Sequence, residues 1–146
     1  MSTILLLSGP NLNLLGEREP AIYGTETLDD HVERARVAAE RNGMDLDHVQ
    51  SNHEGVLVDA IHEARGERAA IIINAGAFTH YAWAIHDALA AFEGVIVELH
   101  LSNPGAREAW RHDSVVTPVA TGVISGFGGR GYELAVEAVA GLVDRD

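Results

Sequence analysis

Short runs of apolar residues alternate with longer amphipathic stretches along the whole chain. The apolar runs predict five strands, at residues 4–7, 44–50, 69–74, 95–99 and 119–124. Apolar residues at helical spacing predict four helices, at residues 27–43, 55–65, 83–92 and 132–143. The unbroken apolar run at residues 71–73 is typical of a strand that is buried on both faces of its sheet.

Strands that alternate with helices indicate right-handed crossovers and therefore a parallel sheet. The length of 146 residues fits a single domain that spans residues 1–146. From this length and element count we predict an α/β, flavodoxin-like three-layer fold, with a five-stranded parallel sheet of order 2-1-3-4-5 and helices on both faces. Ligands of such sheets bind outside the carboxyl ends of the strands, next to the first strand.

Polar side chains stand at the ends of three predicted strands. Asn11 follows the first strand, Asn74 ends the third, and Glu98 and His100 end the fourth. Because parallel strands end at the same edge of a sheet, we expect these groups to lie close together. This edge is the predicted functional site.

A long loop, residues 9–24 with the sequence GPNLNLLGEREPAIYG, follows the first strand. Loops longer than about 12–15 residues are usually lids or binding elements. This loop places Arg18 five positions before Tyr23. A permanently charged arginine favours the anionic form of a nearby phenol, which makes Tyr23 a candidate general base. A structural loop with a solvated Arg18 and a packed Tyr23 explains the local pattern equally well.

Two further pairs of residues carry candidate chemistry. Glu98 and His100 share one face of their strand, where a carboxylate can orient an imidazole for general acid catalysis. A purely structural ion pair at the strand end is the alternative. Asn74 and His80 flank the turn after the third strand, and suit contacts with substrate hydroxyls. Their alternative roles are to satisfy turn backbone groups and to cap a helix.

Two arginines lie four residues apart near the carboxyl end of the fourth strand. Arg107 and Arg111 have the spacing of neighbours on a helix, and either is a candidate clamp for a substrate carboxylate. Ion pairs with Glu108 or Asp113 on the surface are the alternative.

The charge balance limits the class of partner. The chain has 22 acidic and 10 basic residues and a net charge of -12, which repels nucleic acid. A small anionic substrate is compatible with this charge if a few arginines gather locally. All 10 basic residues are arginines, which excludes both an imine-forming lysine and the lysine of a P-loop.

Several other site classes are not expected. The chain has no cysteine, and its 8 histidines form no metal-binding motif, so we expect no metal and no cofactor. A G-x-G-x-x-G motif at residues 126–131 is followed by only one helix, and we interpret it as a turn that packs this helix. No apolar stretch approaches the ~18 residues of a membrane span, and the first residues lack a basic signal region, which favours the cytoplasm.

Motifs distributed over nearly the whole chain resemble one enzyme family. They lie at residues 9–24, 74–80, 98–103, 106–111 and 120–132, with Asp87 between the second and the third. In this order and spacing they are similar to the type II 3-dehydroquinate dehydratases of the shikimate pathway. The resemblance implies conversion of 3-dehydroquinate to 3-dehydroshikimate and water through an enolate, without a cofactor. A flavodoxin-like binding module without catalysis is the alternative.

The resemblance also implies catalytic roles. Tyr23 would remove the proton from C2 of the substrate, and Arg18 would hold Tyr23 as tyrosinate. His100, oriented by Glu98, would protonate the departing C1 hydroxyl. Asn11 would stabilise the enolate, through a bound water.

For the substrate's hydroxyls and carboxylate, the resemblance implies five binding residues: Asn74, His80, Leu101, Ser102 and Arg111. Asp87 would reach the site of a neighbouring subunit, because the family assembles as trimers that group into a dodecamer. A homo-oligomer of this kind is therefore expected. Pro104-Gly105 and Trp110 depart from the residues that are more usual in the family at these positions.

Overall fold

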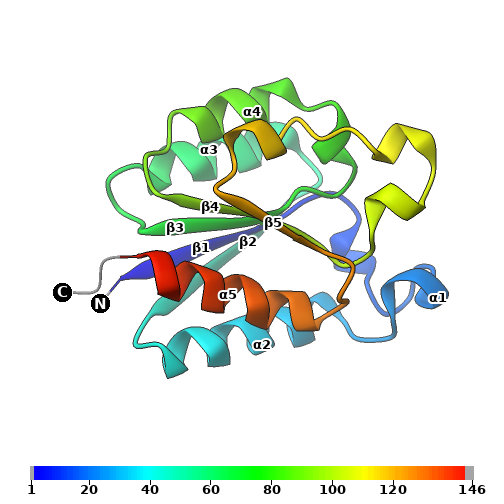
Figure 1. The fold of residues 1–146 in the computed structure, drawn as a ribbon, viewed down its shortest axis with the longest axis horizontal. Helices are drawn as coiled ribbons and strands as arrows, with labels where there is room; N and C mark the ends of the chain where they lie inside the picture. The colour runs from blue at the N-terminus through cyan, green and yellow to red at the C-terminus, as the bar shows by residue number, and fades with distance from the viewer. Residues whose placement is uncertain (1, 144–146) are drawn as a thin grey trace.

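A five-stranded parallel sheet forms the middle layer of the computed structural model, which describes residues 2–143 (Figure 1). Its strands are β1 (Thr3–Ser8), β2 (Asp45–Gln50), β3 (Ala70–Asn74), β4 (Val95–His100) and β5 (Gly122–Ser125). They lie in the order β2-β1-β3-β4-β5, and every neighbouring pair is parallel. The predicted sheet and its order are therefore confirmed.

Helices cover both faces of the sheet (Figure 1). One face carries α2 (Leu28–Arg41) and α5 (Arg130–Leu142), and the other carries α3 (Glu54–Ala64) and α4 (Trp83–Ala90). The short helix α1 (Pro20–Tyr23) lies beyond the carboxyl ends of the strands. Five 3-10 turns complete the structure: η1 (Leu12–Leu14), η2 (Gly76–His80), η3 (Pro104–Ala106), η4 (Ala109–Arg111) and η5 (Thr117–Val119).

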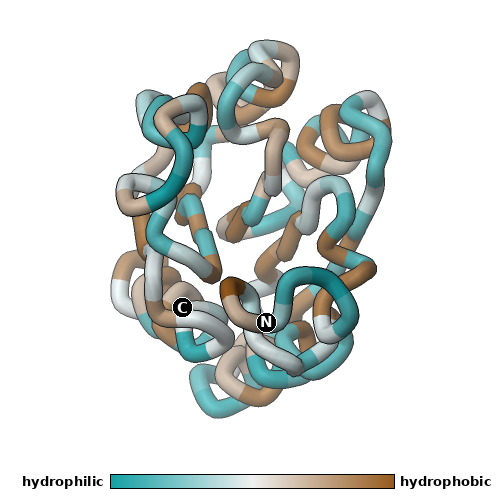
Figure 2. The backbone as a smooth tube through the Cα atoms, turned by 90° about the vertical axis from the view of Figure 1, so that its right-hand side faces the viewer, coloured by the Kyte–Doolittle hydropathy of each residue, from teal (hydrophilic) through white to brown (hydrophobic). Residues whose placement is uncertain are grey.

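The core consists of two apolar layers, one on each face of the sheet. Leu6 and Ile72 face α2 and α5, whereas their neighbours Leu7 and Ile73 face α3 and α4. Successive side chains of a strand point to opposite faces, so a central strand needs apolar residues at every position. Figure 2 accordingly shows hydrophobic residues along the strands and hydrophilic residues mainly on the outer turns.

Helix α2 begins with a reciprocal pair of hydrogen bonds between Thr27 and Asp30. The Thr27 hydroxyl accepts a hydrogen bond from the Asp30 amide at 3.2 Å, and the Asp30 carboxylate accepts one from the Thr27 amide at 2.9 Å. This reciprocal capping box satisfies two backbone donors that a helix start leaves without partners. It fixes the point at which the chain leaves the loop that follows β1.

The structure corrects two predicted boundaries near the carboxyl terminus. The fifth strand was expected at residues 119–124, but Pro118 lies in the turn η5 and β5 begins only at Gly122. The last helix begins at Arg130 rather than at residue 132. Gly131, in the first turn of this helix, packs so closely that a Cβ there would lie 2.8 Å from Leu99 Cδ1. The glycine motif at residues 126–131 thus brings α5 onto the sheet, which is the role expected for it.

His31 of α2 and Tyr132 of α5 stack in parallel inside the core, with their ring centroids 5.0 Å apart. Both side chains are buried, and neither ring nitrogen of His31 has a hydrogen-bond partner among the described residues. Burial lowers the pKa of His31, because the charged imidazolium would lose its hydration there. Burial, assisted by the charge of Arg36, also lowers the pKa of His48.

We expect these histidines to make the free energy of unfolding depend on pH. Below the ordinary histidine pKa of 6.5, the two histidines bind protons in the unfolded chain but remain neutral in the folded chain. The free energy of unfolding therefore falls as the pH falls toward the lower pKa of the folded state. Above pH 6.5 the contribution of these histidines to the stability of the fold is fully present. Denaturant titrations between about pH 5 and pH 8 measure the effect.

His31→Phe removes one titrating group and keeps a ring to stack on Tyr132, so the decline toward acid pH should become shallower. The same substitution at His62, which is exposed on α3, is the matched control and should leave the decline as it is. An equal slope in the two variants would contradict this assignment.

Candidate active site

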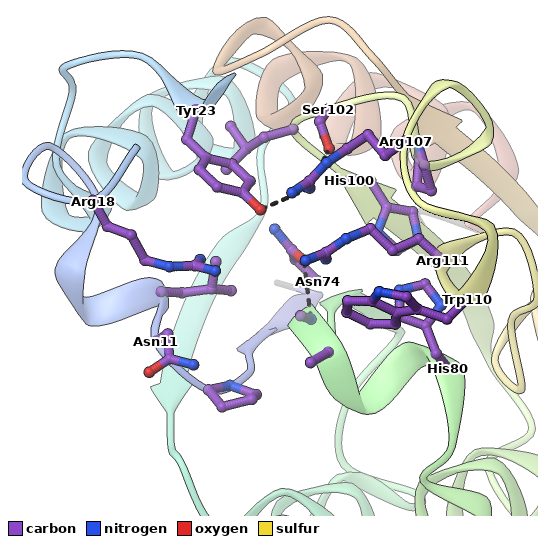
Figure 3. A pocket seen from close by; sticks show the side chains of 16 residues that line it. Asn11, Arg18, Tyr23, Asn74, His80, His100, Ser102, Arg107, Trp110 and Arg111 are labelled. Atoms are coloured by element: carbon purple, nitrogen blue, oxygen red, sulfur yellow. Dashed lines mark hydrogen bonds between the residues drawn. The ribbon is translucent and has the colours of Figure 1, made fainter. Parts of the chain in front are cut away.

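A cavity of about 170 Å³ lies at the carboxyl end of the sheet, where the loops after β1, β3 and β4 meet (Figure 3). The labelled residues of Figure 3 line it: Asn11, Arg18, Tyr23, Asn74, His80, His100, Ser102, Arg107, Trp110 and Arg111. Leu101 lines it as well. Of the 11 site residues expected from the sequence, only Glu98 and Asp87 are not part of this lining.

The parallel register brings the strand ends together. Ser8 of β1 pairs with Asn74 of β3, and Ile73 pairs with Glu98 of β4, so these strands end at the same edge. The Asn74 carbonyl oxygen Oδ1 accepts a hydrogen bond from the Gly76 amide at 3.2 Å. This contact fixes the side chain, whose NH₂ group carries two hydrogen-bond donors.

Asn11 reaches the cavity through an unusual backbone conformation. Its φ of 67° lies in the left-handed region, which asparagine tolerates better than most residues. The Asn11 amide donates to Oδ1 of Asn52 at 3.0 Å, which holds the turn in place. The backbone is therefore anchored, whereas the side chain lies at the cavity (Figure 3).

Glu98 lies behind His100 and contacts it directly. Its carboxylate is 2 % exposed, and its Oε2 atom accepts a hydrogen bond from His100 Nε2 at 2.6 Å. Burial alone would raise the pKa of Glu98, but the hydrogen bonds from His100, Thr117 and Ser114 outweigh burial and lower it. The carboxylate is therefore ionised, and Nδ1 is the nitrogen of His100 that remains for a ligand.

Tyr23 projects into the cavity from the carboxyl end of α1, between two arginines. Arg107 Nη1 donates a hydrogen bond to the Tyr23 hydroxyl at 2.7 Å (Figure 3). The guanidinium carbons of Arg18 and Arg107 both lie 5.2 Å from the centre of the tyrosine ring. From the sequence, Arg18 was the only arginine expected near the Tyr23 phenol. The structure adds Arg107, which contacts the phenol oxygen.

The loop at residues 9–24 is more ordered than the sequence indicates. It contains the turn η1 and the helix α1, which starts with Pro20 at a position that needs no backbone donor. The turn before it places Glu19 at a φ of 42°, and Glu19 pairs with Arg18 at 3.5 Å. These features direct Tyr23 back toward the strand ends.

Arg111 and its neighbours form the far wall of the cavity. Arg111 pairs with Glu108 at 2.9 Å and lies 4.0 Å above the ring of Trp110, yet it also lines the cavity. The His80 ring meets Trp110 edge-on at 5.3 Å, and its Nδ1 donates to the Asp113 carbonyl at 2.6 Å. Each ring is thereby held in one orientation. The ion pair expected as the alternative for Arg111 is present, and it leaves the guanidinium beside the cavity.

Sequence reasoning missed two residues that contact the Glu98 carboxylate. Ser114 Oγ donates to it at 2.9 Å and Thr117 Oγ1 at 2.5 Å. Both residues lie in an irregular segment, where no periodicity relates them to β4. Asp87 is exposed on α4, and within residues 2–143 it is not part of the lining of this cavity.

The cavity is locally basic although the chain is acidic. Three arginines, at positions 18, 107 and 111, line it against a net charge of -12 for the whole chain. This arrangement attracts a small anion. Residues 2–143 contain no group of three or more side chains suited to hold a metal ion. Over the same residues, no helix has the length and apolar character that crossing a bilayer requires.

A sequence model of the family described as "Dehydroquinase class II" matches residues 2–140 of the chain. The chain belongs to this family. A relative from Halalkalibacterium halodurans, named 3-dehydroquinate dehydratase, is 54% identical over 139 residues, which cover 95% of this chain and 96% of the relative. A relative from Aspergillus clavatus, named catabolic 3-dehydroquinase, is 55% identical over 138 residues, with 94% and 92% covered.

A solved class II structure shows the same fold. The crystal structure of the type II dehydroquinase from Propionibacterium acnes superimposes with a TM-score of 0.93 at 43% identity, and covers 97% of both chains. The family, the flavodoxin-like fold and the hydro-lyase class of enzyme, each expected from the sequence, are therefore confirmed.

Proposed function

We propose that this chain removes water from 3-dehydroquinate to give 3-dehydroshikimate in the shikimate pathway, with a tyrosinate as the base. The observation that carries the proposal is the placement of Tyr23 and His100 on one cavity that three arginines line. The names of the curated relatives support the choice of substrate. Because the chain has no lysine, the substrate ketone itself must accept the electron pair, as an enolate.

In the first step, Tyr23 takes the proton from C2, next to the ketone. The charges of Arg18 and Arg107 favour tyrosinate over the neutral phenol, and Arg107 also donates a hydrogen bond to its oxygen. The electron pair of the C–H bond forms a C2–C3 double bond, and the π electron pair of the carbonyl moves to the C3 oxygen. Asn11 stabilises this oxyanion, through a bound water.

In the second step, the enolate re-forms the ketone and expels the C1 hydroxyl. The C1–C2 double bond forms, the C1–O bond breaks, and His100 supplies the proton that converts the hydroxyl to water. Glu98 occupies Nε2 of His100, so Nδ1 is the atom from which the proton passes to the leaving hydroxyl. Afterwards one proton returns from Tyr23 to His100 through solvent, which restores both groups.

Substrate binding falls to the remaining lining residues. Asn74, His80, Leu101, Ser102 and Arg111 contact the hydroxyls and the carboxylate in this proposal. It further includes a cytoplasmic homo-oligomer of trimers grouped into a dodecamer, in which Asp87 reaches a neighbour's site. Exposed Trp83, close to Asp87 in the chain, supports an interface there, because large exposed apolar side chains often mark contact surfaces.

A direct assay tests the reaction. Purified protein mixed with 3-dehydroquinate should produce the ultraviolet absorbance of a conjugated enone at a rate proportional to protein concentration. A flavodoxin-like binding module without catalysis would give no such absorbance, and a flavin carrier would absorb visible light. Either result would refute the proposal.

Arg107→Leu should lower kcat by about 100-fold, the usual cost of removing one donor that stabilises a developing or fixed anion. Leucine keeps part of the apolar stem but removes both the charge and the hydrogen bond to Tyr23. The measurement is kcat and KM with 3-dehydroquinate. Arg41→Leu, at the exposed end of α2, is the matched control and should leave both constants at their original values. Equal kcat in the two variants would show that Tyr23 does not depend on Arg107.

A further inference from the structure

Two hydroxyl groups hold Glu98 from a segment that has no part in the proposed chemistry. Thr117 Oγ1 lies 2.5 Å from Glu98 Oε1, and Ser114 Oγ lies 2.9 Å from Glu98 Oε2. The Oε2 atom is also the one that accepts from His100 Nε2. Three donors therefore converge on one buried carboxylate.

The hydrogen-bond pattern of Ser114 fixes the direction of its contact with Glu98. Ser114 Oγ accepts from the Val116 amide at 3.0 Å and from the Thr117 amide at 3.1 Å. A hydroxyl has two acceptor sites and one donor, so only its O–H remains for Glu98. Ser114 can serve Glu98 only as a donor, which favours the ionised carboxylate over the carboxylic acid.

Hydrogen bonds tie the segment that carries the two hydroxyls, residues 113–117, to η2 and α4. The Val115 amide donates to the Thr79 carbonyl at 2.8 Å. His80 Nδ1 donates to the Asp113 carbonyl, and His86 Nδ1 donates to the Val115 carbonyl, each at 2.6 Å. These bonds come from η2 and the first turn of α4. The hydroxyls are thus held in place before any substrate arrives, as preorganised donors must be.

We infer that Ser114 and Thr117 are positioning residues, which keep Glu98 ionised and oriented so that it holds His100 with Nε2–H toward Glu98 and Nδ1 toward the substrate. The inference rests on the proposed function for its kinetic consequence. Its structural consequence, the tautomer of His100, does not depend on catalysis. Neither residue lines the cavity that holds Tyr23, and the hydroxyl of each donates a hydrogen bond to Glu98, so we assign their effect to Glu98.

Thr117→Val tests this role with little change in side-chain shape. Loss of a hydrogen bond to a charged group should lower kcat by about 10-fold, with KM within about 2-fold of its original value. Thr117→Ser keeps the hydroxyl and should restore kcat. Thr121→Val is the matched control, because the Thr121 hydroxyl accepts from the Ile96 amide and does not contact Glu98. Thermal unfolding of each variant verifies that the fold persists.

Nitrogen NMR of the histidine rings supplies a second readout, with the His100 signals assigned by their loss in His100→Gln. In the original protein the neutral His100 ring should carry its proton on Nε2, and in Thr117→Val a mixture of the two tautomers should appear. Ser114→Ala combined with Thr117→Val should enlarge this shift and lower kcat by about 100-fold.

The two readouts separate the two proposals. An original protein without dehydratase activity refutes the proposed function, while the NMR comparison still tests the positioning role. Dehydratase activity in the original protein, together with equal kcat and equal His100 tautomers in Thr117→Val and Thr121→Val, overturns the positioning role alone.

Discussion

Tyr23→Phe should reduce kcat by about 1,000-fold, within the range of 100- to 10,000-fold that general acid–base groups contribute. Phenylalanine keeps the ring that Arg18 and Arg107 approach and that packs against the core, so the local structure should persist. What disappears is the oxygen that takes the C2 proton. KM should therefore change by only a few-fold, and steady-state kinetics with 3-dehydroquinate measure both constants.

Tyr81→Phe is the matched control for this variant. Tyr81 is 59% exposed and does not line the cavity, so the same loss of a hydroxyl there should leave kcat unchanged. A Tyr23→Phe protein that keeps more than about a tenth of its turnover would contradict the role of Tyr23, since loss of a general base costs at least about 100-fold.

His100→Gln should also reduce kcat by about 100- to 10,000-fold, but at a different step. Glutamine offers an N–H donor for the Glu98 carboxylate and no proton that it can transfer to the leaving hydroxyl. Tyr23 still removes the C2 proton in this variant. In deuterated water we therefore expect deuterium to replace the C2 hydrogen of 3-dehydroquinate without formation of product, as followed by proton NMR.

The exchange experiment distinguishes the acid from the base. Tyr23→Phe should show neither product nor exchange, whereas His100→Gln should show exchange alone. His62→Gln, on the exposed surface of α3, is the control and should behave as the original protein. If His100→Gln abolished exchange as well, His100 would be needed for proton removal, and the division of roles between the two residues would be wrong.

The hydrophobic pattern alone predicts the sheet, because a central strand such as β3 is buried on both faces and is therefore apolar at nearly every position. The lining of the cavity at Asn74 and His100 follows from the same source, since parallel strands deliver their last residues to one edge. Two boundaries are not encoded in the hydrophobic pattern: β5 begins at Gly122 rather than at residue 119, after the turn that contains Pro118, and α5 begins at Arg130 rather than at residue 132.

The hydrophobic pattern does not predict contacts between irregular segments. Arg107 meets Tyr23 across 84 residues, and its position depends on the turns η3 and η4 rather than on a regular element. Thr117 reaches Glu98 only because backbone carbonyls tie its segment to η2 and α4. Spacing along the chain gives no measure of these distances.

The burial of Tyr132 has a practical consequence for measuring the proposed base. The chain has three tyrosines, and burial raises the pKa of Tyr132 to about 12. Its phenol therefore stays protonated up to strongly alkaline pH and adds no phenolate absorbance below it. In a Tyr81→Phe background, the long-wavelength ultraviolet absorbance of phenolate then reports on Tyr23 alone, so the charge state of the base becomes readable without a label, a ligand or turnover.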